Sequence, residues 1–227
     1  MSKKSVLVVA AHPDDEVLGC GGTIAAHVAR GDEVHVAILA QGLNSRGPAS
    51  AEAFAHLHAA ATRARTILGA STLALFDYPD NRLDTVALLD LVKEVERLIE
   101  QHQPSRVYTH IASDLNIDHR RTHEAVITAC RPVPGHPVDS VLCFEVPSST
   151  EWVPAASGMP FVPNWFHDIT ATLDKKLAAL EAYATEMRLF PHPRSLEAVR
   201  HLAAWRGASV GFGAAEAFVL ARQHIVI

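Results

Sequence analysis

A group of ionisable side chains follows directly on an apolar stretch near the start of the chain. Residues 5–11 read Ser-Val-Leu-Val-Val-Ala-Ala, and the next five, His12-Pro-Asp-Asp-Glu16, carry one imidazole and three carboxylates. Carboxylates packed this closely repel one another, so a fold that tolerates them needs a proton or a cation to neutralise them. The proline disfavours a helical conformation at the histidine before it, which indicates a loop. In such a loop His12 and Asp15 can converge on one point while Asp14 approaches from the side.

A second polar segment, Asp114-Leu-Asn-Ile-Asp-His119, follows a strand-like stretch that ends at residues 108–110. If this strand lies next to the first one, in a parallel sheet whose order reverses there, both segments line one crevice at the carboxyl ends of the strands. One His and one Asp from the first loop and one His from the second then make three protein ligands. Three such ligands with an open position for water are typical of a catalytic zinc site.

The two segments resemble the signature motifs of a known enzyme family. Ala11-His-Pro-Asp-Asp-Glu16 and Asn116-Ile-Asp-His119 are similar to those of the PIG-L/LmbE-like N-acetylglucosaminyl deacetylases. Pro79-Asp-Asn-Arg-Leu-Asp84, Pro191-His-Pro-Arg-Ser195 and Ala215-Glu-Ala-Phe218 extend the resemblance over most of the chain. It implies a Rossmann-like sheet, a divalent metal, usually zinc, and removal of acetyl groups from N-acetylated sugars.

The resemblance also implies a role for each residue of the motifs. His12, Asp15 and His119 would hold the metal. Asp14 would be the general base, and Asp118 would orient a neighbouring side chain. A metal lowers the pKa of bound water towards about 7. A carboxylate can then take the proton of this water as it attacks the acetyl carbonyl, while the metal and nearby donors stabilise the oxyanion.

Asn116 departs from the family pattern. Most members have a histidine at this position, which is assigned to protonating the leaving amine or stabilising the oxyanion. An asparagine can donate a hydrogen bond to an oxyanion but cannot serve as a proton donor near neutral pH. Either Asp14 acts as both base and acid, or another group such as His110 or His192 protonates the amine. The departure concerns the group that protonates the leaving amine and does not change the expected metal ligands.

Other polar residues are candidates for contacting the substrate. The loops expected after the second and third strands lie at the same edge of the sheet as the metal site and suit a hydroxyl-rich ligand, although exposed loops are polar in any case. The candidates are Arg46, Asp80, Asn81 and Arg82, together with His110 and His192.

The elements that would position these residues alternate between strand and helix. Strands are expected at 5–11, 33–40, 72–76, 105–109 and 140–146, and helices at 17–30, 50–68, 84–101 and from about 119. This rhythm predicts an α/β fold with a Rossmann-like, doubly wound, mainly parallel sheet and helices on both faces. After a proline-broken loop at 147–164, helices are expected at 170–189 and 195–207, and an apolar segment at 216–227. One domain is expected over residues 1–227.

Gly19-Cys-Gly-Gly22 raises the question of a dinucleotide loop. The dinucleotide fingerprint would need its third glycine where Ile24 stands, and the acidic residues before it would repel a pyrophosphate. Close packing of a helix on the sheet is the better interpretation of these glycines.

The overall composition indicates a cytoplasmic protein, and the resemblance implies a small-molecule N-acetylated sugar or glycoconjugate as its partner. The formal charge of the 227 residues is -5, which points to neither nucleic acid nor an acidic membrane surface as a partner. No apolar run approaches the roughly 18 residues that a transmembrane helix needs. The basic and apolar N-terminus imitates a signal peptide, but it runs into His12-Pro-Asp-Asp-Glu16 and not into a small-residue cleavage site. Three cysteines without metal-binding spacing are interpreted as reduced thiols.

The sequence therefore predicts a metal-dependent hydrolase that removes an N-acetyl group from an amino sugar or a glycoconjugate, as a monomer or a homo-oligomer. Zinc is the expected metal, although two imidazoles and a carboxylate also accept Fe2+, Mn2+ or Co2+. A non-haem iron oxygenase uses the same donor set, but with His-x-Asp spacing on β-barrels. A non-catalytic sugar-binding or metal-binding protein on the same fold is the other alternative.

Overall fold

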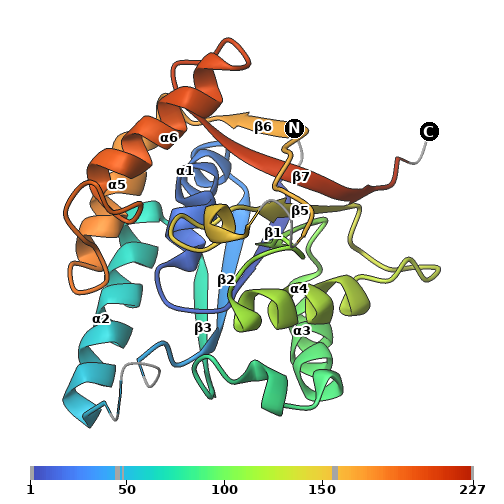
Figure 1. The fold of residues 1–227 in the computed structure, drawn as a ribbon. Coiled ribbons are helices and arrows are strands. Elements are labelled where there is room, and N and C mark those ends of the chain that lie inside the picture. The colour runs from blue at the N-terminus through green and yellow to red at the C-terminus, as the bar shows by residue number, and fades with distance from the viewer. Residues whose placement is uncertain (1–2, 44–46, 48, 155–157, 226–227) are drawn as a thin grey trace.

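A seven-stranded mixed sheet forms the centre of the computed structural model, which describes residues 3–43, 47, 49–154 and 158–225 (Figure 1). The strands are β1 (Ser5–Ala10), β2 (Glu33–Ala40), β3 (Thr72–Tyr78), β4 (Arg106–His110), β5 (Ser140–Phe144), β6 (Trp165–Asp168) and β7 (Ala215–Gln223). The helices are α1 (Asp15–Ala29), α2 (Ala51–Leu68), α3 (Leu88–His102), α4 (Ile117–Ala129), α5 (Leu173–Ala182) and α6 (Leu196–Ala208), with short 3-10 turns η2 (Leu83–Thr85) and η3 (Thr150–Trp152).

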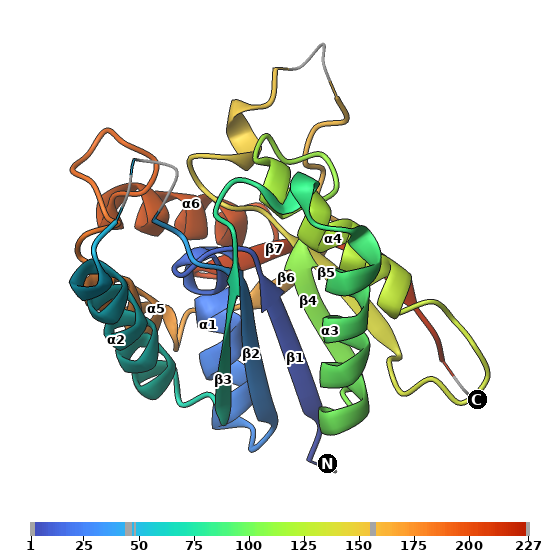
Figure 2. The ribbon, with the colours of Figure 1, turned by 90° about the horizontal axis from the view of Figure 1, so that it is seen from below.

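Strand β1 is buried on both faces, because helices cover both sides of the sheet. Val6 and Val8 point into a core with α1, α2 and α5, whereas Leu7 and Val9 point into a second core with α3 and α4. Figure 2 shows α1, α2, α5 and α6 on one side of the sheet and α3 and α4 on the other. The continuous apolar run at 5–11 is therefore the signature of a central parallel strand. The predicted fold class is confirmed.

The strand order is β3-β2-β1-β4-β5-β7-β6. Strand β1 pairs in parallel with β2 on one side and with β4 on the other, so the order reverses at β1. The loops after β1 and β4 consequently leave the sheet side by side, at the position where doubly wound sheets hold their ligands. The prediction that both polar segments line one crevice required this arrangement.

The C-terminal part differs from the expectation in two respects. The final apolar segment is β7, which runs antiparallel between β5 and β6, and the four-residue strand β6 was not predicted. The helix expected at 170–189 is shorter, because the Asp168 carboxylate accepts hydrogen bonds from Thr170 in a turn before α5, and the chain turns again at Tyr183. Residues 183–195, called here the 183–195 segment, form a series of turns that contains the cis peptide bond Phe190–Pro191.

The glycines of α1 allow close packing, as predicted. A Cβ on Gly19 would overlap the ring of Phe144, and one on Gly22 would lie 2.9 Å from Ile169. These contacts bring α1 close to β5 and to the segment before α5. All three cysteines of the chain are buried and free. No helix in the described parts of the chain has the length and apolar character needed to cross a membrane.

Two buried histidines predict acid sensitivity of the fold. Burial lowers the pKa of His27 to about 4, against the opposing effect of Asp32, and lowers that of His167 to about 3. An imidazole in the unfolded chain has a pKa near 6.5, so the unfolded state binds more protons below that pH, and the free energy of unfolding falls as the pH drops from 6.5 towards 4. His27 alone should account for a loss on the order of 2 to 3 kcal/mol at pH 4.

Urea unfolding at pH 7 and pH 4.5 measures this loss. The His27→Gln variant keeps a polar group beside Tyr108 and Asp32 but cannot be protonated, so its stability should depend less on pH than that of the wild type. Equal pH dependence of the two proteins would show that His27 does not titrate in this way.

Candidate active site

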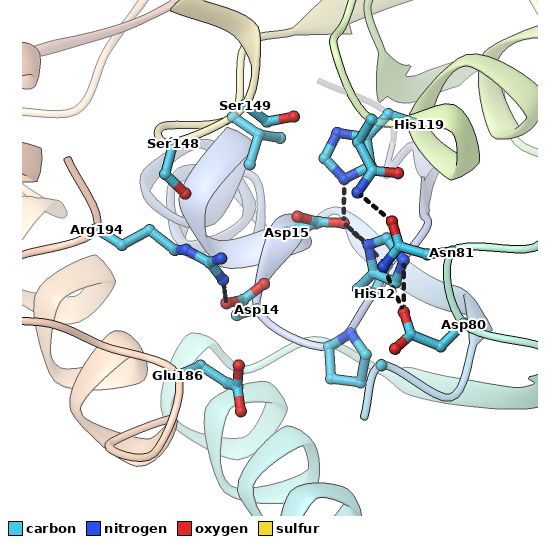
Figure 3. Close-up of a pocket in the computed structure, with 14 residues that line it drawn as sticks. His12, Asp14, Asp15, Asp80, Asn81, His119, Ser148, Ser149, Glu186 and Arg194 are labelled. Carbon is cyan, nitrogen blue, oxygen red and sulfur yellow. Dashed lines mark hydrogen bonds and ion pairs between the residues drawn. The ribbon is translucent and has the colours of Figure 1, made fainter. Parts of the chain in front are cut away.

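A polar cavity of about 190 Å³ opens at the carboxyl ends of the parallel strands (Figure 3). Its walls come from the loops after β1, β2, β3, β4 and β5 and from the 183–195 segment. Segments from both ends of the chain therefore contribute to one site.

Three residues converge at the floor of this cavity. Asp15 Oδ2 lies 3.2 Å from His12 Nδ1 and 3.1 Å from His119 Nε2. One nitrogen or oxygen atom of each residue lies within 4.8 Å of the others, which is close enough for the three to share one cation. The imidazoles of the two polar segments thus point to one place, as the sequence predicted.

Carboxylates fix the orientation of His12. Its Nε2 lies 3.0 Å from Asp118 Oδ2 and 3.3 Å from Asp80 Oδ1. Asp118 in turn accepts hydrogen bonds from the backbone N–H groups of Asn81, at 2.6 Å, and Leu83, at 2.9 Å. With both its oxygens engaged in this way, Asp118 acts as an acceptor for a proton on Nε2. The lone pair of Nδ1 is then directed at Asp15. Metal-binding histidines are normally oriented in this way, by a hydrogen bond from the other ring nitrogen to a carboxylate.

His119 also has a carboxylate beside one ring nitrogen, at ion-pair distance and without a hydrogen bond. Its Nδ1 lies 3.1 Å from Asp114 Oδ1, so its Nε2 faces Asp15. Asp114 accepts hydrogen bonds from the hydroxyl groups of Ser149 and Thr150 and from the backbone N–H of Asn116. Burial raises the pKa of Asp114, but His119 and these hydrogen bonds outweigh it and lower the pKa to about 2. Asp114 therefore stays ionised beside the imidazole.

The charges of the cluster fit a bound cation. Burial lowers the pKa of His119, but Asp15 and Asp114 outweigh it and raise the pKa to about 9. Burial acts on His12 in the same direction, but Asp118, Asp15 and Asp80 outweigh it and raise the pKa of His12 above its ordinary value. The carboxylates therefore favour a positive charge among the two imidazoles and Asp15. A divalent metal would supply that charge, and its binding would release protons from the imidazoles.

The contact between His119 and Asp114 leads to a prediction for metal affinity. Asp114→Asn should weaken metal binding by about 10- to 100-fold, because carboxylate partners of metal-binding histidines contribute effects of this size. Competition with a fluorescent chelator measures the dissociation constant. Asp174→Asn is a suitable control, since this carboxylate is 92% exposed and lies on α5. An unchanged affinity in Asp114→Asn would mean that Asp114 does not support the ligand.

Asp14 lies beside the cluster and is not one of the three converging residues. Its backbone adopts a φ of 108°, and its N–H donates to Glu16 Oε2, while Tyr183 donates to Glu16 Oε1 at 2.7 Å. Arg194 Nη1 donates to Asp14 Oδ2 at 3.0 Å. Burial and the charge of Asp15 raise the pKa of Asp14 to about 8, and Arg194 opposes this shift. The strained backbone places this carboxylate at the cavity, as expected of a functional residue.

Comparison with known proteins identifies the family. The model of the PIG-L family, described as GlcNAc-PI de-N-acetylase, matches residues 7–130. The chain belongs to this family. The matched region includes both polar segments, most of β1 and the whole of β2, β3 and β4.

Three similar proteins illustrate the range of the PIG-L family. A 4-oxalmesaconate hydratase of Pseudomonas putida is 32% identical, over 92% of this chain and 84% of its own. A probable N-acetyl-alpha-D-glucosaminyl L-malate deacetylase 2 of Bacillus anthracis is 28% identical, over 82% of each chain. The crystal structure of the conserved protein TT1542 from Thermus thermophilus has a TM-score of 0.76 and 27% identity, over 99% of this chain and 97% of its own.

Asn116, the residue that departs from the motif which its segment resembles, caps α4. Its Oδ1 accepts a hydrogen bond from the backbone N–H of Asp118 at 2.8 Å, and its Nδ2 donates to Asn81 Oδ1 at 3.0 Å. Asn116 and Asn81 both line the cavity. The asparagine thus joins the loops after β3 and β4 at the cavity wall, where it offers an amide and no titrating group.

His110 and His192 do not line the cavity. The His110 side chain is fully buried, its Nε2 accepts a hydrogen bond from the backbone N–H of Ala11, and its ring stacks on His119 at 4.0 Å. His192 Nδ1 accepts from the backbone N–H of Arg194, and its ring packs against Trp152. In this structure both histidines support neighbouring residues, and a contact of either with the substrate or the amine stays a prediction.

The loop after β3 places two of its three predicted substrate-binding residues at the cavity. Asp80 and Asn81 line the cavity, where Asp80 also contacts His12. Arg82 is exposed and does not line the cavity. Arg46 lies outside the described residues.

Four polar residues of the cavity wall were not predicted as site residues. Ser148 and Ser149 follow β5, and Glu186 and Arg194 belong to the 183–195 segment. Arg194 lies within Pro191-His-Pro-Arg-Ser195, which carried part of the family resemblance and was the one available signal. The others belong to no motif of recognisable spacing.

Proposed function

We propose that the protein is a metal-dependent deacetylase that removes an N-acetyl group from an amino sugar or its conjugate. The convergence of His12, Asp15 and His119 beside the carboxylate of Asp14 carries this proposal. Deacetylases of amino-sugar conjugates among the relatives, such as the Bacillus anthracis protein, support it.

The metal would be held by His12 Nδ1, Asp15 Oδ2 and His119 Nε2. Two imidazoles and one carboxylate are suited to zinc, which we propose as the metal, although they also accept Fe2+, Mn2+ or Co2+. When bound, the metal supplies a Lewis acid that polarises the acyl carbonyl and lowers the pKa of water. Asp118 and Asp114 hold the two imidazoles in the orientation that this requires.

Asp14 would move the proton. As a water molecule attacks the acyl carbon, the Asp14 carboxylate takes one of its protons. When the C–N bond breaks, the leaving nitrogen takes a proton, and Asp14 is the group that returns it. Asn116 cannot do so near neutral pH, and His110 and His192 do not line the cavity. The products are acetate and a free amine.

Addition of water to an unsaturated carboxylate is a second candidate reaction, because the relative with 32% identity is a hydratase. Such a reaction uses the same activation of water but directs it to a carbon–carbon double bond. The charges of the cavity favour deacetylation. Asp14, Asp15, Asp80 and Glu186 contribute carboxylates to its wall, and the guanidinium of Arg194 is already paired with Asp14. A neutral N-acetyl sugar enters these surroundings at a lower electrostatic cost than a polycarboxylate.

A substrate screen tests the proposal. The purified, zinc-loaded protein is incubated with a panel of N-acetylated sugars and glycoconjugates, and primary amine and acetate are measured separately. We expect both to appear in equal amounts with at least one compound. Loss of the ultraviolet absorbance of an unsaturated dicarboxylate, with no release of amine or acetate, would identify a hydratase instead. Binding of sugars without any turnover would indicate a non-catalytic protein.

A further inference from the structure

The 183–195 segment is joined to the Asp14 loop at two points. At its start, Tyr183 donates to Glu16, which accepts from the backbone N–H of Asp14. Near its end, Arg194 donates to the carboxylate of Asp14. Asp14 is therefore held both by its backbone and by its side chain, and both contacts lead to the same distant segment. Neither Tyr183 nor Arg194 is one of the three residues that converge on the proposed metal position.

Arg194 occupies an unusual position in the wall of the cavity. Among the described residues that line it, Arg194 is the one that carries a guanidinium or ammonium group. It reaches Asp14 from the side opposite to His12 and Asp80 (Figure 3). Its Nη1 donates to Asp14 Oδ2 at 3.0 Å, and its Nε is buried without a hydrogen-bond partner among the described residues. The half-buried side chain is thus oriented mainly by one carboxylate.

We propose that Arg194 is a positioning residue for Asp14, which fixes the carboxylate so that one oxygen faces the reacting water and the leaving nitrogen. This inference rests on the proposed function. Since Arg194 engages Oδ2, Oδ1 remains available for proton transfer. The guanidinium also offsets the repulsion between Asp14 and its neighbours Asp15 and Glu186, which would otherwise turn the side chain away. In this cavity the same carboxylate has to accept and return the proton, so its orientation matters in both steps.

A binding role for Arg194 makes a different prediction. If the guanidinium served mainly to bind an anionic group of the substrate, its removal would raise KM and leave kcat largely unchanged. If it positions the base, its removal lowers kcat with little change in KM. Misplacement of a reacting group by about 1 Å can cost about 100-fold in rate.

A double-mutant cycle between Arg194 and Asp14 tests the proposal. Arg194→Met, Arg194→Lys, Asp14→Asn and the double variant Arg194→Met/Asp14→Asn are compared with the wild type under single-turnover conditions. We expect Arg194→Met to lower kcat by about 10- to 100-fold with KM within about twofold, and Arg194→Lys to recover part of the loss. In the Asp14→Asn background the same change should cost less than about threefold, because there is no base left to position. Equal losses in both backgrounds, or a change confined to KM, would overturn the proposal.

Arg206 provides a matched control. It forms a comparable ion pair with Glu145, at 2.7 Å, and does not line the cavity. Arg206→Met should lower Tm without lowering kcat. The Tm values of the Arg194 and Asp14 variants form a second cycle that needs no substrate, and non-additive Tm shifts are expected from a formed ion pair. Inactivity of the wild type towards every acetamide would refute the proposed function, whereas additive Tm shifts would refute the Arg194 contact itself.

Discussion

Asp14→Asn is expected to lower kcat by about 1000-fold while the protein keeps its full complement of metal. An amide of the same shape cannot accept a proton, and general acid–base catalysis contributes about 100- to 10,000-fold to a rate. Asp14 is not one of the three residues that converge on the metal position, so metal content should not change. Amine release under saturating substrate measures the first quantity, and elemental analysis of the purified protein measures the second.

Asp90→Asn is the control for this variant, because Asp90 is an exposed carboxylate on α3. It should match the wild type in kcat, metal content and Tm. An Asp14→Asn protein with normal turnover would rule out Asp14 as the base. A protein whose biological role is only to bind a sugar or a metal would also tolerate this change, so the variant separates the hydrolase from that alternative.

His119→Ala is expected to abolish both metal binding and turnover. In the proposed metal site this imidazole supplies one of the three donors, and it also contributes to the neutralisation of Asp15 and Asp114. Since loss of a residue that merely supports a metal-binding histidine costs about 10- to 100-fold in affinity, loss of the ligand itself should cost more than about 100-fold. Metal titration by calorimetry and amine release by the loaded protein measure the two effects.

His123→Ala controls for the removal of an imidazole from the same helix. His123 lies one turn further along α4, where its Nδ1 contacts the backbone carbonyl of His110. This variant should retain metal and activity even if its Tm falls. Full metal affinity in His119→Ala would contradict the assignment of the ligands.

The sequence was sufficient to predict the parallel half of the fold. Residues 5–11 and 33–40 are apolar at nearly every position, because both faces of these strands are covered by helices. Strand β6 could not be read in this way, since its four residues include exposed and half-buried positions and pair only with β7. The antiparallel orientation of β7 could not be predicted either, because it depends on how the chain returns through α6 and not on the apolar pattern of the strand.

The convergence of His12, Asp15 and His119 could be predicted because they lie in two short segments with strong chemical signals. His12 and Asp15 crowd against other carboxylates, and His119 follows Asp114 and Asp118 within one segment. The surroundings of Asp14 could not be predicted from the sequence. Glu186 and Arg194 come from turns far along the chain, and only the tertiary fold brings them to the cavity. His110 shows the opposite case. It lies near the site in sequence, but it is turned into the core, where it accepts a hydrogen bond from Ala11.

Removal and restoration of the metal test the central claim most directly. The protein is treated with a chelator, its metal content is checked by elemental analysis, and amine release is measured before and after addition of one equivalent of zinc. We predict no amine release by the metal-free protein and recovery of the original rate with zinc. Amine release that continues at the original rate in protein verified to be free of metal would contradict the account.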